Sequence, residues 1–246
     1  RAEEGYRDEL ADAERVLGDS RAALEEVGEV TAGEPGAALG RFVEGWASEN
    51  LGWPERAESS YRAALRLDPA LGDARVRLSL LLATRSFLES TTLQSKRGDG
   101  LGRALELARE AGEIAAPAAT TRSGRIARDL AGALVAFAEK DFDGARRNAR
   151  EGIGRHGSGP GIEWLHWMAG LADHGPEGLP AYDQAIALRP HFALARFCRG
   201  MARTSARDST GALADYEDAI RFQPRFTAAY LNRAALRHDR DHHRPF

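Results

Sequence analysis

Several features of this sequence could do chemistry, and the densest of them is a histidine cluster near its end. His238 and His242 are four residues apart in the run HDRDHH, with Asp239 between them and His243 directly after. On a continuing helix, residues four apart share a face, so the two imidazoles could bind zinc or nickel. The cluster lies at a chain end and lacks a third ligand held by neighbouring structure. We therefore expect a solvated polar tail with no metal bound, and a metalloenzyme stays as an alternative.

Other reactive residue types have simpler interpretations. The glycine cluster GSGPG over 157–161 could cradle a phosphate, but no Lys followed by Ser or Thr comes after it, so it predicts a turn between helices. His166 lies between Trp164 and Trp167, a pattern that favours a packed helix residue over a catalytic base. Cys198 is the single cysteine and has no convincing histidine partner. We expect no catalytic residue and no cofactor in this chain, and hence no enzyme.

Paired carboxylates also occur, and the densest group is Asp215 with Glu217 and Asp218. A pair of carboxylates does acid and base work only where burial or a neighbour shifts a pKa. Nothing in the surrounding sequence predicts burial here, so we expect the solvated face of an amphipathic helix.

Composition excludes several classes of function. The 246 residues are 43% hydrophobic and 29% charged, and no apolar run approaches the roughly 18 residues that span a bilayer, so we expect no membrane insertion. The net charge of −3 is too small and too evenly mixed to predict nucleic-acid binding. One cysteine gives no sign of an oxidising compartment, so a cytoplasmic location is expected. Only two of the 34 basic residues are lysine, which suggests a GC-rich bacterium.

The elements that position these residues follow an internal repeat. The segments GLPAYDQAIALRP and ALADYEDAIRFQP align without a gap and end at Pro190 and Pro224, 34 residues apart. A third copy, RAESSYRAALRLDP, ends at Pro69. In every copy two small residues seven apart flank a tyrosine. Small residues on one face let a second helix approach to about 8–10 Å, and the proline ends the helix.

A second small residue precedes two of these segments by 12 positions and predicts an earlier helix, so each unit is a helix hairpin. This pattern resembles the tetratricopeptide repeat (TPR). The resemblance implies an all-α, right-handed α-solenoid of antiparallel helix hairpins. The residues that carry it are Gly45, Ala57, Ala64 and Pro69 in one copy, and Gly200, Ala212, Ala219 and Pro224 in another.

The repeat also predicts the domain organisation. Residues 1–36 hold 11 acidic and 4 basic residues and are expected to form two short helices, over 2–17 and 20–30, as a degenerate or capping region. Residues 37–226 hold the repeats, two of them degenerate, with an insertion near 84–102 that is a long loop or a helix extension. Residues 227–246 form a capping helix and a tail.

The resemblance implies a function in binding. First helices of successive TPR hairpins line a concave groove that holds peptides or partner helices, and the inward positions here are mostly apolar, which favours an apolar peptide or an amphipathic helix. The alternative is that these side chains pack against neighbouring repeats. Asn232 either bonds a ligand backbone or is an ordinary surface residue. The predicted groove residues are Phe42, Trp46, Leu194, Phe197, Met201, Leu231 and Asn232.

Two further expectations concern partners. The lysine and asparagine positions with which some TPR proteins clamp a terminal carboxylate are held here by residues such as Trp46 and Phe197, so we do not expect recognition of that kind. The chain is expected to be a non-catalytic scaffold for a protein or peptide partner, and the apolar groove leaves a homodimer open. The alternative is the C-terminal TPR region of a bacterial, planctomycete-type serine/threonine protein kinase, which the Arg-rich and Ala-rich repeats resemble.

Overall fold

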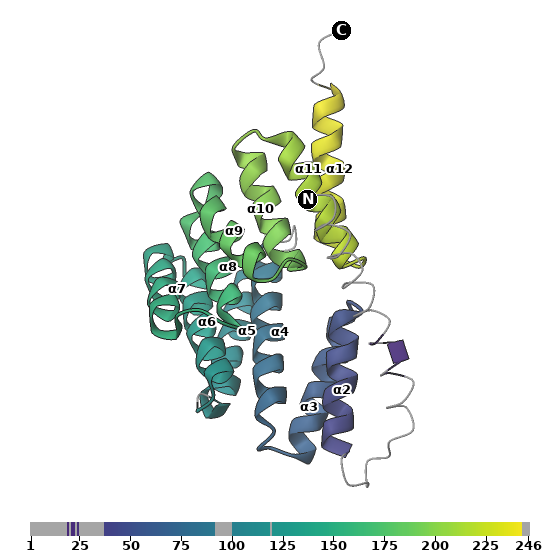
Figure 1. The fold of residues 1–246 in the computed structure, drawn as a ribbon, viewed down its shortest axis with the longest axis vertical. Helices are drawn as coiled ribbons and strands as arrows, with labels where there is room; N and C mark the ends of the chain where they lie inside the picture. Colours follow the sequence, from purple (N-terminus) through teal and green to yellow (C-terminus); the bar gives the residue numbers. More distant parts are fainter. Residues whose placement is uncertain are drawn as a thin grey trace. The chain divides into compact units, whose positions relative to one another are not determined.

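The computed structural model describes residues 37–91, 100–118 and 120–242, together with four helical positions near the start of the chain (Figure 1). Every regular element in these ranges is a helix, which confirms the all-α prediction. The helices expected over 2–17 and 20–30 fall outside the described residues, apart from Asp19, Arg21, Ala22 and Leu24.

The chain divides into two compact units, residues 1–140 and residues 141–246. In the first unit, α2 pairs with α3 and α4 pairs with α5, and α6 packs on both α4 and α5. This division falls inside the predicted repeat region, and the predicted limits at 36 and 226 stay predictions. The first unit comprises α2 (Ala37–Asn50), α3 (Pro54–Leu67), α4 (Gly72–Thr91), α5 (Gly100–Ala115), the 3-10 turn η2 (Ala116–Ala118) and α6 (Arg122–Ala138).

In the second unit each helix packs against the next. The 3-10 turn η3, which precedes α9, also packs against α8. The second unit comprises α7 (Phe142–His156), α8 (Ile162–Asp173), η3 (Gly175–Gly178), α9 (Leu179–Leu188), α10 (Ala193–Ser205), α11 (Ser209–Phe222) and α12 (Thr227–His242). The turn predicted over 157–161 joins α7 to α8, and its three glycines have positive φ, a conformation that a side chain disfavours.

The α2–α3 and α10–α11 hairpins are each held by a tyrosine that lies on a glycine of the preceding helix. A Cβ added to Gly45 would lie 2.5 Å from the ring of Tyr61, and one added to Gly200 would lie 2.6 Å from the ring of Tyr216. Both rings are buried. Because the spacing from glycine to tyrosine along the chain is the same in both copies, the two hairpins have the same register, as the repeat predicts.

The α8–α9 hairpin uses the same contact in a different register. Tyr182, which aligns with Tyr216 in the repeat, lies on Gly170, and the chain between this glycine and its tyrosine is shorter than in the other two hairpins. The backbone of Gly178 in η3 also approaches that of Gly170 so closely that a Cβ there would lie 2.2 Å from the Gly170 carbonyl oxygen. With the 3-10 turn, the tyrosine of the second helix reaches its glycine after a connection that is about one helical turn shorter than in the other two hairpins.

The α4–α5 pair replaces the glycine–tyrosine contact with serines. Ser79 donates to the carbonyl of Ala111 at 2.8 Å, and Ser86 donates to the carbonyl of Ala104 at 2.6 Å. The alanines seven apart are fully buried, so this degenerate copy keeps its small-residue face. Part of the insertion predicted near 84–102 is a helix extension, since α4 continues to Thr91; residues 92–99 lie outside the described ranges.

Gly200→Ala should lower the free energy of unfolding by about 2 kcal/mol, because the new methyl meets a buried ring that has no room to move. The matched control is Gly154→Ala, an exposed helical glycine of the same unit with open space around its Cα, which should be neutral or raise stability by up to about 1 kcal/mol. The measurement is the urea midpoint followed by circular dichroism. Equal shifts for both variants would contradict this packing.

Candidate functional site

The seven residues predicted to line a groove divide into buried and accessible ones. Phe42 and Phe197 occupy the same register of the repeat, and each ring lies 6.0 Å from that of the hairpin tyrosine, Tyr61 or Tyr216. Phe197 is only 1% exposed because Phe226 also covers it at 4.8 Å. Leu194 is buried as well. For Phe197 and Leu194 the packing alternative describes the structure.

Asn232 contributes to packing within the second unit. Its side chain hydrogen-bonds the hydroxyl of Tyr216, which also lies 3.1 Å from the hydroxyl of Thr204. Burial raises the pKa of Tyr216, and these two hydrogen bonds offset that rise only in part. The amide of Asn232 therefore joins α12 to α11 through a buried phenol.

Accessible apolar side chains gather on α12. Leu231 is 58% exposed and Tyr230 is 40% exposed, and the following Ala234 and Ala235 are exposed too. We name these four residues the α12 face. Leu231 stands one repeat after Phe197, in the same register, but no element among the described residues covers it. Met201 is half-buried on α10, the preceding first helix, which contacts α12.

A second accessible group lies on α2. Phe42 and Trp46 are half-buried, and Leu39, one turn earlier on the same side of the helix, is exposed. We name these three residues the α2 face. The sequence interpretation missed Leu39 and Tyr230 because it followed the family's inward positions, although the spacing of Leu39 from Phe42 and Trp46 indicates a shared face.

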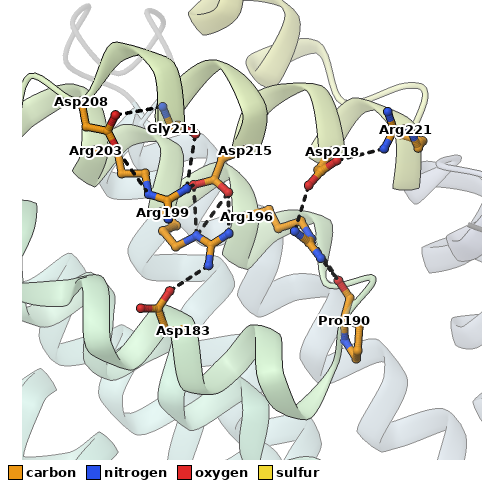
Figure 2. Close-up of polar contacts among 10 residues, drawn as sticks. All are labelled: Asp183, Pro190, Arg196, Arg199, Arg203, Asp208, Gly211, Asp215, Asp218 and Arg221. Carbon is orange, nitrogen blue, oxygen red and sulfur yellow. Dashed lines mark hydrogen bonds and ion pairs between the residues drawn. The ribbon is translucent and has the colours of Figure 1, made fainter. Parts of the chain in front are cut away.

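An ion-pair network fixes the position of α10, and it corrects the expectation that Asp215 lies on a solvated face (Figure 2). Asp215 is 1% exposed. Both of its carboxylate oxygens accept from Arg199, at 2.6 and 3.0 Å, and one also accepts from Arg203 at 2.9 Å. Arg199 extends to Asp183 of α9 at 2.7 Å. The buried carboxylate of Asp215, on α11, is neutralised by two guanidinium groups from α10.

The same face of α10 makes a second set of bonds. Arg196 donates to the carbonyl of Pro190 from two nitrogens, at 2.9 and 2.8 Å, and to Asp218 at 2.9 Å. Asp218 also accepts from Arg221 at 3.0 Å. Figure 2 shows both sets along α10, and together they tie α10 to α11 and, through Asp183, to α9.

The remaining reactive residues have packing roles. Cys198 is buried and its sulfur accepts a hydrogen bond from the indole of Trp167 at 3.2 Å; burial raises the pKa of the thiol to about 12, so it stays protonated at neutral pH. His166 is half-buried, and burial lowers its pKa despite the nearby carboxylate of Glu163. The His166 imidazole is therefore neutral at neutral pH.

The described ranges contain neither a cluster of metal-ligating side chains nor a helix that could span a membrane. No group of three or more His, Cys, Asp or Glu side chains in the residues placed by the structure could hold a metal ion. His238 is exposed on α12 and His242 ends that helix, while His243 lies outside the described residues. Among the helices described, none combines the length and the apolar character needed to cross a bilayer.

The comparisons with known proteins agree with this geometry. No family model and no curated protein matches the sequence. TTC0263, a TPR protein of Thermus thermophilus, matches 81% of this chain over 98% of its own length, with a TM-score of 0.53 and 18% identity. The chain has a TPR-like fold. Human IFIT1, solved as a dimer with m7Gppp-AAAA, matches 95% of the chain with a TM-score of 0.56 and 15% identity, and this chain spans about half of its length.

Asp215→Ala should lower the free energy of unfolding by about 3–5 kcal/mol, because it leaves the Arg199 guanidinium buried without its main partner. The control is Asp183→Ala, which removes a half-exposed carboxylate from the same arginine and should cost less than about 1 kcal/mol. Urea denaturation of both variants provides the measurement. A cost for Asp215→Ala no larger than that of the control would contradict a stabilising network.

Proposed function

We propose that this chain is a non-catalytic scaffold that binds protein partners on the apolar surface of its first helices. The observation that carries the proposal is the α12 face, where Leu231 and Tyr230 are exposed side by side. In the same register of α10, the chain covers Phe197 with its own aromatic side chains. Leu231 is therefore an uncovered copy of the position that is covered at Phe197, and a partner that buries it gains stability.

The partner expected on the α12 face is a short apolar peptide or an amphipathic helix. Leu231 and Tyr230 are its anchors, and each contributes roughly 1–3 kcal/mol when a ligand buries it, with Met201 of α10 as a further apolar contact. The alanines of the face leave room for a helix to approach closely. Leu194, Phe197 and Asn232 act indirectly, since they hold α10, α11 and α12 in position beneath this surface.

The α2 face is the corresponding surface of the first unit. Trp46 and Phe42 offer aromatic area that is only half-buried, and Leu39 extends it by one turn. Aromatic side chains provide large contact areas at a low cost in side-chain entropy, which suits an anchor. We infer that it binds a second segment of a partner, or a different partner.

The sequence left two alternatives, a homodimer and a segment of a protein kinase. A homodimer through the α12 face would satisfy the same apolar side chains and is separated from partner binding by the molar mass in solution. No observation in the described residues favours the kinase alternative, and neither of the structural relatives above is a kinase.

Peptides selected from a random display library on the immobilised full chain should be apolar, and Leu231→Glu should weaken their binding by at least tenfold, since a charge replaces a buried anchor. The control is Leu188→Glu, which alters an exposed leucine on the second helix α9 and should change affinity less than twofold. Fluorescence anisotropy gives the dissociation constants. Equal loss in both variants, or none in either, would refute binding on the α12 face.

A further inference from the structure

A pocket of about 510 Å³ opens along α2 and α3 in the first unit. Its lining shares no residue with the α2 face, and it is polar where that face is apolar. The residues that line it are Arg41, Glu44, Arg56, Ser59, Ser60, Ala63, Arg66 and Leu67.

The pocket carries an excess of positive charge. Arg41 and Arg56 both donate to Glu44, at 2.8 and 3.1 Å. Burial by itself would raise the pKa of Glu44, but the two arginines outweigh it and lower the pKa, so the carboxylate is ionised at neutral pH. One negative charge therefore faces three guanidinium groups. Arg66 is exposed, and no ion pair involves it within the described part of the chain.

The spacing of the lining residues indicates the shape of the ligand. Arg56, Ala63 and Arg66 follow one side of α3, and the separation of ten positions between the two arginines corresponds to about 15 Å along a helix. An extended peptide advances about 3.3 Å per residue, so two of its carboxylates reach both arginines when they are four or five residues apart. The exposed hydroxyl of Ser59 lies between as a further donor, and the exposed Leu67 offers an apolar contact at one end.

We propose that this pocket binds an acidic peptide segment of a partner protein, with two carboxylates held by Arg56 and Arg66. Arginine donates paired, charge-assisted hydrogen bonds to carboxylates, and an uncompensated guanidinium at the pocket rim also attracts an acidic partner before contact. The inference goes beyond the function proposed above, because it gives the first unit a recognition surface of opposite chemistry. It does not require either apolar face to bind.

The test is binding of fluorescein-labelled octaglutamate to the full chain, followed by anisotropy at 50 and 500 mM NaCl. The wild-type protein should bind at low salt and lose the peptide at high salt. Arg66→Glu should weaken binding at least tenfold, whereas Arg147→Glu, the same change at an exposed arginine of α7, should alter it less than twofold. Circular dichroism verifies that both variants fold. Absent binding, or equal loss in the two variants, would overturn the proposal.

Modification of arginines by phenylglyoxal, mapped by mass spectrometry, identifies the occupant. Octaglutamate should slow modification of Arg56 and Arg66 at least fivefold at low salt and leave Arg147 unchanged. Salt-dependent protection of Arg66 without added peptide would assign the pocket to the acidic residues of the chain itself, such as those in 1–36, and would overturn a partner's peptide as the occupant. Equal protection by inorganic phosphate at the same ionic strength would overturn a peptide site in favour of a simple anion site.

Discussion

In the hairpins α2–α3, α8–α9 and α10–α11, the two helices approach closely because a residue without a side chain lies beneath a buried aromatic ring. Gly45 under Tyr61 and Gly200 under Tyr216 would each place a Cβ within 2.6 Å of a ring carbon. At that distance, packing is possible only with glycine. The ring then fills the space that the glycine leaves, and the small residues seven apart on the second helix complete the contact. The α4–α5 hairpin, which lacks this contact, is joined by the serine hydrogen bonds instead.

The accessible surfaces follow from the repetition of this contact. Because the same register recurs from one repeat to the next, equivalent side chains differ mainly in what covers them. Phe197 is covered by Tyr216 and Phe226, whereas Leu231 has no covering element in the described part of the chain. The ion pairs of Arg196, Arg199 and Arg203 tie α10 to α11, and Arg199 also ties α10 to α9.

The repeat made the hairpins predictable, since tyrosines between small residues seven apart specify a helix face and a partner. Periodicity does not say which faces a later element will cover, so it gave no means to separate buried Phe197 from exposed Leu231. Nor could the sequence near Asp215 predict its burial, because the arginines that neutralise it come from another helix. The early contact of Tyr182 with Gly170 depends on a 3-10 turn, and the repeat alone suggested the register of the other two hairpins.

A double-mutant cycle at Gly200 and Tyr216 tests this account most directly. If the buried ring is what excludes a methyl group, Gly200→Ala should cost at least about 1 kcal/mol less in a Tyr216→Leu background than in the wild type, because the smaller side chain leaves space for the Cβ. The free energies come from urea denaturation of the four proteins. Strictly additive costs would mean that the ring does not set the distance between the helices, and the packing described here would be wrong.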